Sequence, residues 1–336
     1  MKNNQPKVAM LGSGSWATAI MKMLTENLDE VAWYVRSAYT LEHFKMHGHN
    51  PKYLQQVQFD INKIKMSNDI NEVVAYADYI IIAIPSAFVK SELDKININL
   101  SKKFVFSAVK GIVPETLLIL GDHLREIHKV PEKNLGVIAG PCHAEEVAME
   151  RLSYLTIGAK RKNMSIEMAE MLSSWFIKTT YSKDVFGIEW STVLKNVYAI
   201  AAGIGHGLGY GDNFQAVLIS NSIREMKKFV KKNVDKRKRN IDASAYLGDL
   251  LVTSYSIFSR NRTFGSMIGK GYTVKSAMAE MQMVAEGYYA VKSAYKINKD
   301  RKELGAKTPI IDAVFNILYN HANPKTEFTK LTEKLN

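Results

Sequence analysis

The hydrophobic pattern of the chain changes about halfway along its length. In the first half, short apolar runs alternate with stretches of helical periodicity such as residues 16–25. The runs that predict strands are Lys7–Leu11, Val31–Val35, Tyr79–Ile84, Phe104–Ala108, Leu135–Ala139 and Tyr154–Gly158. Strands separated by helices imply crossover connections and a parallel sheet. We therefore expect residues 1–183 to form an α/β, Rossmann-like, doubly wound domain.

Helical periods dominate the rest of the chain, and strand-like runs are no longer found. The clearest predicted helices are Val193–Ala202, Gln215–Val230, Ala277–Ala294 and Ile310–Tyr319. A chain of 336 residues is long enough for two domains that each bury a core. We expect an all-α domain over residues 184–336, with the boundary near residues 181–187.

The net charge of +12 indicates attraction to anions, but much of that charge is local. Eight lysines and arginines lie between positions 227 and 239, with Phe229 as the one aromatic residue among them. Nucleic-acid binding would favour more aromatic side chains for base stacking, so we expect no nucleic-acid partner. The segment is interpreted as a solvated helix end and loop, with weak contact to an anionic membrane surface as an alternative.

Cysteine content and apolar run lengths bear on the compartment. The single cysteine, Cys142, cannot form an internal disulfide, which favours a reducing, cytoplasmic location. The longest dense apolar run, Tyr79–Pro85, is far too short to span a bilayer, so we expect no integral membrane segment. Four histidines, at positions 43, 47, 49 and 143, lack a convincing ligand pattern, and no metal is expected.

A glycine-rich turn follows the first predicted strand. Gly12, Gly14 and Ala17 form the pattern G-x-G-x-x-A at the start of a helix. The first glycine permits a tight turn, and the second lets the backbone approach a pyrophosphate. The helix N-terminus adds free N–H groups and a positive dipole. This context predicts a dinucleotide site.

The end of the second strand bears on which dinucleotide binds. Sites selective for NAD usually carry Asp or Glu there, to bind the ribose hydroxyls. This chain has Arg36 instead, which can pair with a 2′-phosphate. We therefore favour NADP(H) over NAD(H). The alternative is that Arg36 stacks on adenine without contacting the phosphate.

Candidate polar groups cluster in several later motifs. Lys110 and the segment starting at Gly140 each follow a strand, where ligands of open α/β sheets bind. Lys195 lies in Leu-Lys-Asn-Val, and Asp249 in Gly-Asp-Leu. The run Ser259-Arg260-Asn261-Arg262 concentrates donors for an anion such as phosphate.

In this order and spacing, the motifs resemble those of the bacterial NAD(P)-dependent glycerol-3-phosphate dehydrogenases. The similarity extends from the glycine turn to Glu286-Gly287, and the combination of motifs is highly specific. The resemblance implies reduction of dihydroxyacetone phosphate to sn-glycerol 3-phosphate for phospholipid synthesis. It does not fix the oligomeric state. The long apolar helix faces lead us to expect a homodimer.

The resemblance also implies roles for matching positions. Beside the glycines of the turn, it places at the dinucleotide Ser15, Trp16, Arg36, Tyr53, Lys110, Ala144, Arg260, Val284 and Glu286. It places at the substrate Lys110, Gly140, Cys142, Lys195, Asp249, Ser259, Arg260 and Asn261. Lys195 matches the catalytic lysine of the family, Asp249 the carboxylate beside it, and Lys110 lies between cofactor and substrate.

Elementary chemistry agrees with these roles. Ketone reduction builds negative charge on the carbonyl oxygen, which two ammonium groups, Lys110 and Lys195, can stabilise. A neighbouring cation favours the neutral amine, so Lys110 should help Lys195 act as general acid in reduction and general base in oxidation. Asp249 can orient Lys195. Arg260 and Asn261 can fix the phosphate and thereby orient the carbonyl.

The chain departs from the family pattern at a few positions. Ser191-Thr192-Val193 stand where the family usually has Gly-Gly-Ala, and Cys142 replaces a Ser or Thr. These changes put packing around Lys195 and catalytic efficiency in question, but they remove no group that the chemistry needs. Two alternatives stay open: a dehydrogenase of another small acid, and a binding protein without catalytic activity.

Overall fold

A computed structural model describes residues 5–281, 285–300 and 305–336. The chain divides into two compact units. Unit 1 comprises Met1–Val109 and Leu118–Val185, and unit 2 comprises Lys110–Leu117 and Phe186–Asn336. Lys110 therefore groups with the helical half of the chain, although it directly follows the strand-rich half.

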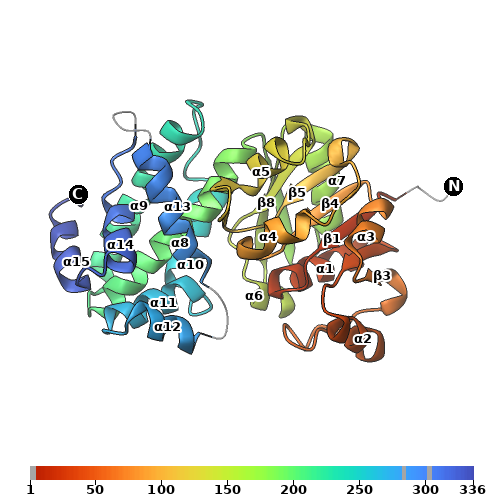
Figure 1. The fold of residues 1–336 in the computed structure, drawn as a ribbon, viewed down its shortest axis with the longest axis horizontal. Helices are drawn as coiled ribbons and strands as arrows, with labels where there is room; N and C mark the ends of the chain where they lie inside the picture. The colour runs from red at the N-terminus through yellow and green to blue at the C-terminus, as the bar shows by residue number, and fades with distance from the viewer. Residues whose placement is uncertain (1–4, 282–284, 301–304) are drawn as a thin grey trace. The chain divides into compact units, whose positions relative to one another are not determined.

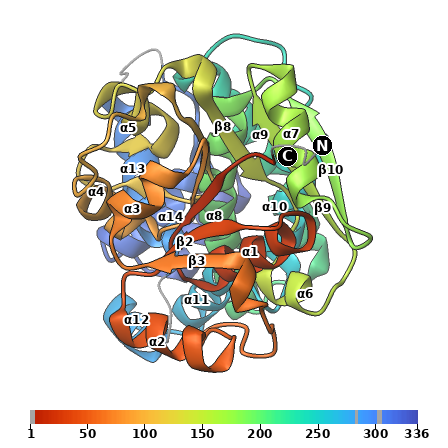
Figure 2. The same cartoon turned by 90° about the vertical axis from the view of Figure 1, so that its right-hand side faces the viewer.

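Unit 1 is built on an eight-stranded sheet with the order β10-β9-β8-β5-β4-β1-β2-β3 (Figures 1 and 2). Its strands are β1 (Val8–Leu11), β2 (Val31–Tyr34), β3 (Ile64–Ser67), β4 (Tyr79–Ile82), β5 (Phe104–Ser107), β8 (Leu135–Ala139), β9 (Ser153–Ala159) and β10 (Ile177–Ser182). From β3 to β8 the order is that of a dinucleotide-binding Rossmann sheet, with its switch point between β1 and β4. The predicted fold class is confirmed.

Helices connect the strands and cover both sides of the sheet (Figure 2). They are α1 (Ser15–Asn27), α2 (Ala38–His47), α3 (Ile70–Tyr76), α4 (Ser86–Leu93), α5 (Leu120–Glu126), α6 (Ala144–Ala148) and α7 (Lys162–Leu172). Two short strands, β6 (Ile112–Val113) and β7 (Leu118–Ile119), lie outside the main sheet. Because strand order reverses after β3, right-handed crossovers place α3 and α4 on the face opposite α1.

The sheet differs from the expected all-parallel arrangement at one side. β9 runs antiparallel to β8, whereas β10 is parallel to β9. The connection between β8 and β9 contains the short helix α6 and returns the chain to the neighbouring position in the sheet. The sequence pattern also did not predict β3 and β10, which are edge strands with mostly exposed or half-exposed residues.

Unit 2 is helical and is organised around the long helix α8 (Val185–Gly207), whose residues from Val185 to Gly205 are all buried. A helix that is buried on every side belongs in the centre of its domain. The elements around it are α9 (Asp212–Asn233), the π-helix η4 (Ser244–Gly248), α10 (Asp249–Tyr255), α11 (Arg260–Gly269), α12 (Val274–Glu280), α13 (Glu286–Asp300), α14 (Pro309–Tyr319) and α15 (Pro324–Thr332) (Figure 1).

The predicted single helix over Ala277–Ala294 is wrong. The backbone of Met281 is extended, which ends α12, and a separate helix starts at Glu286. The amide of Gly287 donates to Oδ1 of Asn261 at 2.8 Å. A side chain distant in sequence thus caps α13, and local periodicity carries no sign of that contact.

The basic segment 227–239 spans the end of α9 and the loop beyond it. Arg237 and Arg239 both pair with Asp235, and the side chain of Arg239 is nearly buried. Within the described residues, no helix is long and apolar enough to cross a membrane.

Glycines let α8 and α11 cross in direct backbone contact. A Cβ at Gly265 would lie 2.1 Å from the carbonyl oxygen of Ile200, and one at Gly203 would lie 2.1 Å from that of Arg262. Gly207 and Gly269 face backbone atoms of the opposite helix in the same way. Because a backbone carbonyl cannot move aside as a flexible side chain can, any larger residue would force the two helices apart.

We expect Gly265→Ala to lower the free energy of unfolding by about 3 kcal/mol or more, since overpacking here displaces backbone. Gly211→Ala is the matched control, because a methyl group there would have no atom within 4 Å and the φ of Gly211 is −81°. That control should cost about 1 kcal/mol or less. Urea unfolding of both variants provides the measurement. Equal losses would mean that the crossing is loosely packed.

Candidate active site

The glycine turn of unit 1 has the geometry of a dinucleotide cradle. Gly12 has a φ of +120°, and a Cβ there would lie 2.7 Å from the carbonyl oxygen of Ala83. Gly14 caps α1 without any side-chain hydrogen bond, and a Cβ at Gly14 would meet nothing within 4 Å. Ser15 is the first residue of α1, so its N–H opens toward that space. The turn can receive a diphosphate at the helix N-terminus.

Asn50 holds this turn in place, a role that was not predicted from the sequence. Its side chain is 1% exposed and donates to the carbonyl of Ser13 at 3.0 Å and to Oγ1 of Thr18 at 2.9 Å. Its Oδ1 accepts from the amide of Tyr53 at 3.2 Å. Asn50 therefore fixes Tyr53 beside the glycine turn. The Asn-Pro pair at 50–51 was the available signal, since it is typical of a turn.

Arg36 stands just beyond β2 with its side chain 59% exposed. Its guanidinium lies over the ring of Phe88 at 5.4 Å and 3.4 Å from Oε1 of Glu92. Glu92 is buried and also accepts from Tyr34 at 2.6 Å. Burial alone would raise the pKa of Glu92, but hydrogen bonds from Lys95, Tyr34 and Arg36 hold it below its ordinary value. A carboxylate, that of Glu92, therefore lies near the end of β2, but its oxygens accept hydrogen bonds from protein side chains.

The other predicted residues of unit 1 follow strand β8 or open α1. β1, β4, β5 and β8 run parallel, so their carboxyl ends share one edge of the sheet. Gly140 ends β8 with a φ of +127°. Cys142 is buried in the core, and Ala144 begins α6. Trp16, in the first turn of α1, packs against the same core while staying partly exposed.

The central feature of unit 2 is a buried ion pair between Lys195 of α8 and Asp249 of α10. The ammonium donates directly to Oδ1 of Asp249, and the two side chains are 4% and 2% exposed. Oδ2 of Asp249 is buried and has no hydrogen-bond partner among the described residues. Each charge needs the other here, because desolvation of a lone ion costs several kcal/mol. The free oxygen can still accept a hydrogen bond from a ligand.

Ser191 and the π-helix η4 fix the position of Asp249. The hydroxyl of Ser191 lies 2.7 Å from the carbonyl oxygen of Ile188 and 2.8 Å from that of Ala245. It thereby ties α8 to η4, which ends directly before Asp249. π-Helical turns are often found at functional sites.

The start of α11 lies in the same unit. Ser259 is its N-cap, and its hydroxyl accepts from the amide of Arg262 at 3.3 Å. Arg260 is exposed at the first helical position. The side-chain amide of Asn261 is oriented by the backbone N–H of Gly287, which donates to its Oδ1. The Nδ2 group of Asn261 can therefore donate to a ligand. The hydroxyl of Ser259 is thus already engaged in capping.

Further contacts connect α8 with α13 and with Lys110. A Cβ at Gly287 would lie 2.7 Å from the carbonyl oxygen of Asn196, so α13 meets α8 one residue beyond Lys195. Glu286 begins α13 beside this contact. The side chain of Asn196 donates to the carbonyl of Lys110 at 2.7 Å. No role for Asn196 was predicted from the sequence. Val284, predicted at the cofactor, lies outside the described residues.

Three of the four histidines considered as metal ligands gather at the end of α2. Nε2 of His43 lies 3.2 Å from Nε2 of His49, and the rings of His43 and His47 are 4.4 Å apart. Among the described residues, no group of three or more His, Cys, Asp and Glu side chains could hold a metal ion.

A Rossmann sheet with an open glycine turn, joined in one chain to a helical unit that buries a lysine–aspartate pair, is typical of two-domain dehydrogenases that use a pyridine dinucleotide. Two family models match this chain. The model of the NAD-dependent glycerol-3-phosphate dehydrogenase N-terminus matches residues 7–165, and that of the C-terminus matches residues 184–329. The chain belongs to this family.

Individual relatives agree with the family models. A Bacillus subtilis (strain 168) protein named glycerol-3-phosphate dehydrogenase, NAD(P)+, is 34% identical over 97% of this chain and 93% of its own length. A protein of the same name from Syntrophotalea carbinolica is 31% identical over 97% of each chain. A crystal structure of glycerol-3-phosphate dehydrogenase from Coxiella burnetii has a TM-score of 0.88 and 26% identity, covering 98% of this chain and 99% of its own.

We expect Asp249→Ala to lower the free energy of unfolding by about 3–5 kcal/mol, because it leaves the ammonium of Lys195 buried without a counter-charge. The double variant Lys195→Met, Asp249→Leu removes both charges and should recover most of that loss. Chemical denaturation measures both. A cost below about 1 kcal/mol for Asp249→Ala would mean that the pair behaves like a solvated surface pair.

Proposed function

We propose that this protein reduces dihydroxyacetone phosphate to sn-glycerol 3-phosphate with NAD(P)H, supplying a precursor for glycerophospholipids. The observation that carries the proposal is the buried Lys195–Asp249 pair, which lies in the same helical unit as the Arg260–Asn261 helix start. Family membership over nearly the whole chain supports the reaction class. NAD(P) use is part of the name of the bacterial relatives.

In this proposal, unit 1 binds the dinucleotide. Gly12 and Gly14 shape a turn that fits a pyrophosphate, and the free N–H groups at the start of α1 bind it. When bound, the nicotinamide supplies the hydride for the carbonyl carbon. Ser15, Trp16 and Tyr53 contact the cofactor around the turn. Ala144, Glu286 and Val284 are proposed as further cofactor contacts.

Unit 2 supplies the proton and holds the phosphate. Lys195 donates a proton to the carbonyl oxygen as the alcohol forms, and Asp249 keeps the ammonium aligned. Lys110 stabilises the negative charge that develops on that oxygen. Arg260 and Nδ2 of Asn261 bind the phosphate, so that binding energy remote from the carbonyl orients it. Gly140, Cys142 and Ser259 are proposed to line the substrate.

We infer a cytoplasmic homodimer from the single buried cysteine and from exposed apolar side chains on and after α10, such as Tyr255 and Ile257. Any contact with anionic membranes would involve the basic segment 227–239. No nucleic-acid partner is proposed.

Purified protein mixed with NADPH and dihydroxyacetone phosphate should consume NADPH, followed by absorbance at 340 nm. We expect Lys195→Ala to lower kcat by about 10²–10⁴, since general acid catalysis contributes that much. Dinucleotide binding, measured by NADPH fluorescence, should survive. Lys270→Ala, which changes an exposed lysine of unit 2, is the control. Near-normal kcat in Lys195→Ala would reject the acid–base role, and no turnover by folded, dinucleotide-binding wild type would reject the reaction.

The proposed preference for NADP(H) rests on Arg36, whose exposed guanidinium can pair with a 2′-phosphate. We expect Arg36→Ala to raise the KM for NADPH about tenfold and that for NADH less than about twofold. Lys95→Ala is the control, because Lys95 is another cation that binds Glu92. If Arg36→Ala raises both KM values equally, Arg36 stacks on adenine without contacting the phosphate.

A further inference from the structure

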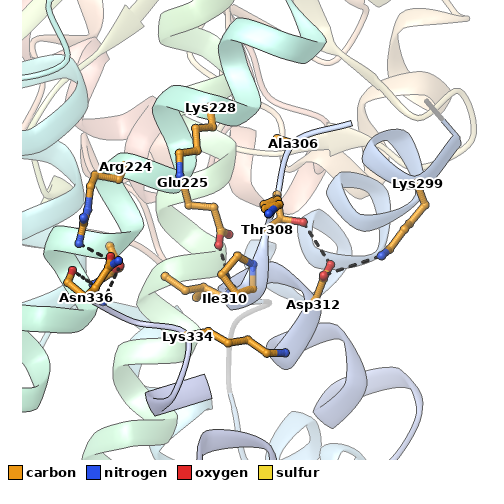
Figure 3. Close-up of a pocket in the computed structure, with 13 residues that line it drawn as sticks. Arg224, Glu225, Lys228, Lys299, Ala306, Thr308, Ile310, Asp312, Lys334 and Asn336 are labelled. Carbon is orange, nitrogen blue, oxygen red and sulfur yellow. Dashed lines mark hydrogen bonds and ion pairs between the residues drawn. The ribbon is translucent and has the colours of Figure 1, made fainter. Parts of the chain in front are cut away.

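We propose that a pocket in unit 2 binds a small phosphate-bearing anion, at a position not used by the proposed dehydrogenase reaction. The pocket has a volume of about 480 Å³. Residues of α9, α13 and α14 line it, together with residues 306–308 and the end of the chain (Figure 3). This volume falls within the range of small-molecule sites. None of the residues proposed for catalysis lines it.

The lining carries an excess of positive charge. Its cations are Arg224, Lys228, Lys299, Lys307 and Lys334, its side-chain carboxylates are Glu225 and Asp312, and Asn336 adds the terminal carboxylate. Lys299 lies 3.8 Å from Asp312. Across the ranges that the structure describes, Lys228, Lys307 and Lys334 make no ion pair. Several unpaired cations around one cavity repel one another, and a multivalent anion would relieve that repulsion.

Glu225 does not neutralise these cations, because the protein uses its carboxylate elsewhere. Oε2 accepts from the amide of Ile310 at 2.9 Å and Oε1 from that of Ile311 at 3.1 Å, which caps α14 (Figure 3). Burial raises the pKa of Glu225 to about 8, which reduces its negative charge near neutral pH. The floor of the pocket is therefore closer to neutral, while its walls stay positive.

The walls are held in place before any ligand binds. Asn298 is 4% exposed and bonds both the amide and the carbonyl of Ala306, at 2.8 and 2.9 Å, and Oγ1 of Thr308 at 3.1 Å. These bonds fix the backbone on both sides of Lys307. Arg224 and Lys228 are four residues apart on α9, so they lie on one face, where two like charges destabilise the helix. The backbone that carries Lys307 is therefore ordered before binding, which lowers the entropy cost of forming the site.

The arrangement favours phosphate over carboxylate. The cations come from separate elements and approach the cavity from several directions (Figure 3). A tetrahedral phosphoryl group offers at least three charged oxygens that point in different directions, and the guanidinium of Arg224 matches two of them. A planar carboxylate offers two oxygens in a single plane. We therefore expect inorganic pyrophosphate to bind more tightly than citrate.

Titration calorimetry of the full-length protein with pyrophosphate, in a phosphate-free buffer, tests the proposal. The variant Lys228→Gln, Lys334→Gln removes two pocket cations and should weaken binding about tenfold or more. The variant Lys270→Gln, Lys275→Gln removes the same charge from exposed positions of unit 2 that do not line the pocket, and should change binding less than about twofold. All four lysines are exposed, so folding should be kept.

Three results would overturn the proposal. Equal weakening in both double variants would indicate a response to net charge alone. Loss of all pyrophosphate binding in Arg260→Ala would assign the binding to the proposed substrate site. If the pocket binds pyrophosphate, the Arg260→Ala variant should keep the binding that depends on Lys228 and Lys334. Citrate binding as tightly as pyrophosphate would exclude phosphate selectivity. Because none of these readouts uses turnover, failure here is distinguishable from failure of the dehydrogenase proposal.

Discussion

The helical unit depends on keeping two opposite charges out of water. Lys195 and Asp249 are both almost fully buried, so neither tolerates the loss of the other. Their pairing joins α8, the buried central helix, to α10 through a π-helical turn that Ser191 anchors. The ammonium of Lys195 is thereby held in one orientation. The same burial that makes the pair costly also strengthens its electrostatic effect on any bound carbonyl.

Close helix contacts extend this constraint to the phosphate-binding end of the proposed site. Gly203 and Gly265 allow α8 and α11 to touch, which fixes the helix start that carries Arg260 relative to Lys195. Asn261 then caps α13 through Gly287, and Gly287 in turn packs on Asn196. Three helices therefore share one rigid junction. The side chains proposed for substrate binding are mounted on helix starts and helix faces, which position groups better than loops do.

The sequence predicted the core of this architecture because its signals are local. The strands at the centre of the sheet are apolar runs, and the glycine turn has a fixed spacing that backbone geometry explains. Edge strands such as β10 were missed because their exposed residues carry no apolar pattern. The break between α12 and α13 was missed because Asn261 and Gly287, 26 positions apart, determine it. The roles of Asn50 and Ser191 depend in the same way on partners that only the fold brings near.

Asn50 has a consequence for how the protein ages. Asparagine side chains slowly lose ammonia when the nitrogen of the following residue attacks the amide carbon and closes a five-membered imide. The residue after Asn50 is Pro51, whose nitrogen carries no hydrogen and cannot close that ring. Conversion to aspartate would replace the donor to Ser13 and Thr18 by an oxygen that repels theirs. The proline therefore protects the glycine turn from a spontaneous chemical change that would otherwise shorten its working life.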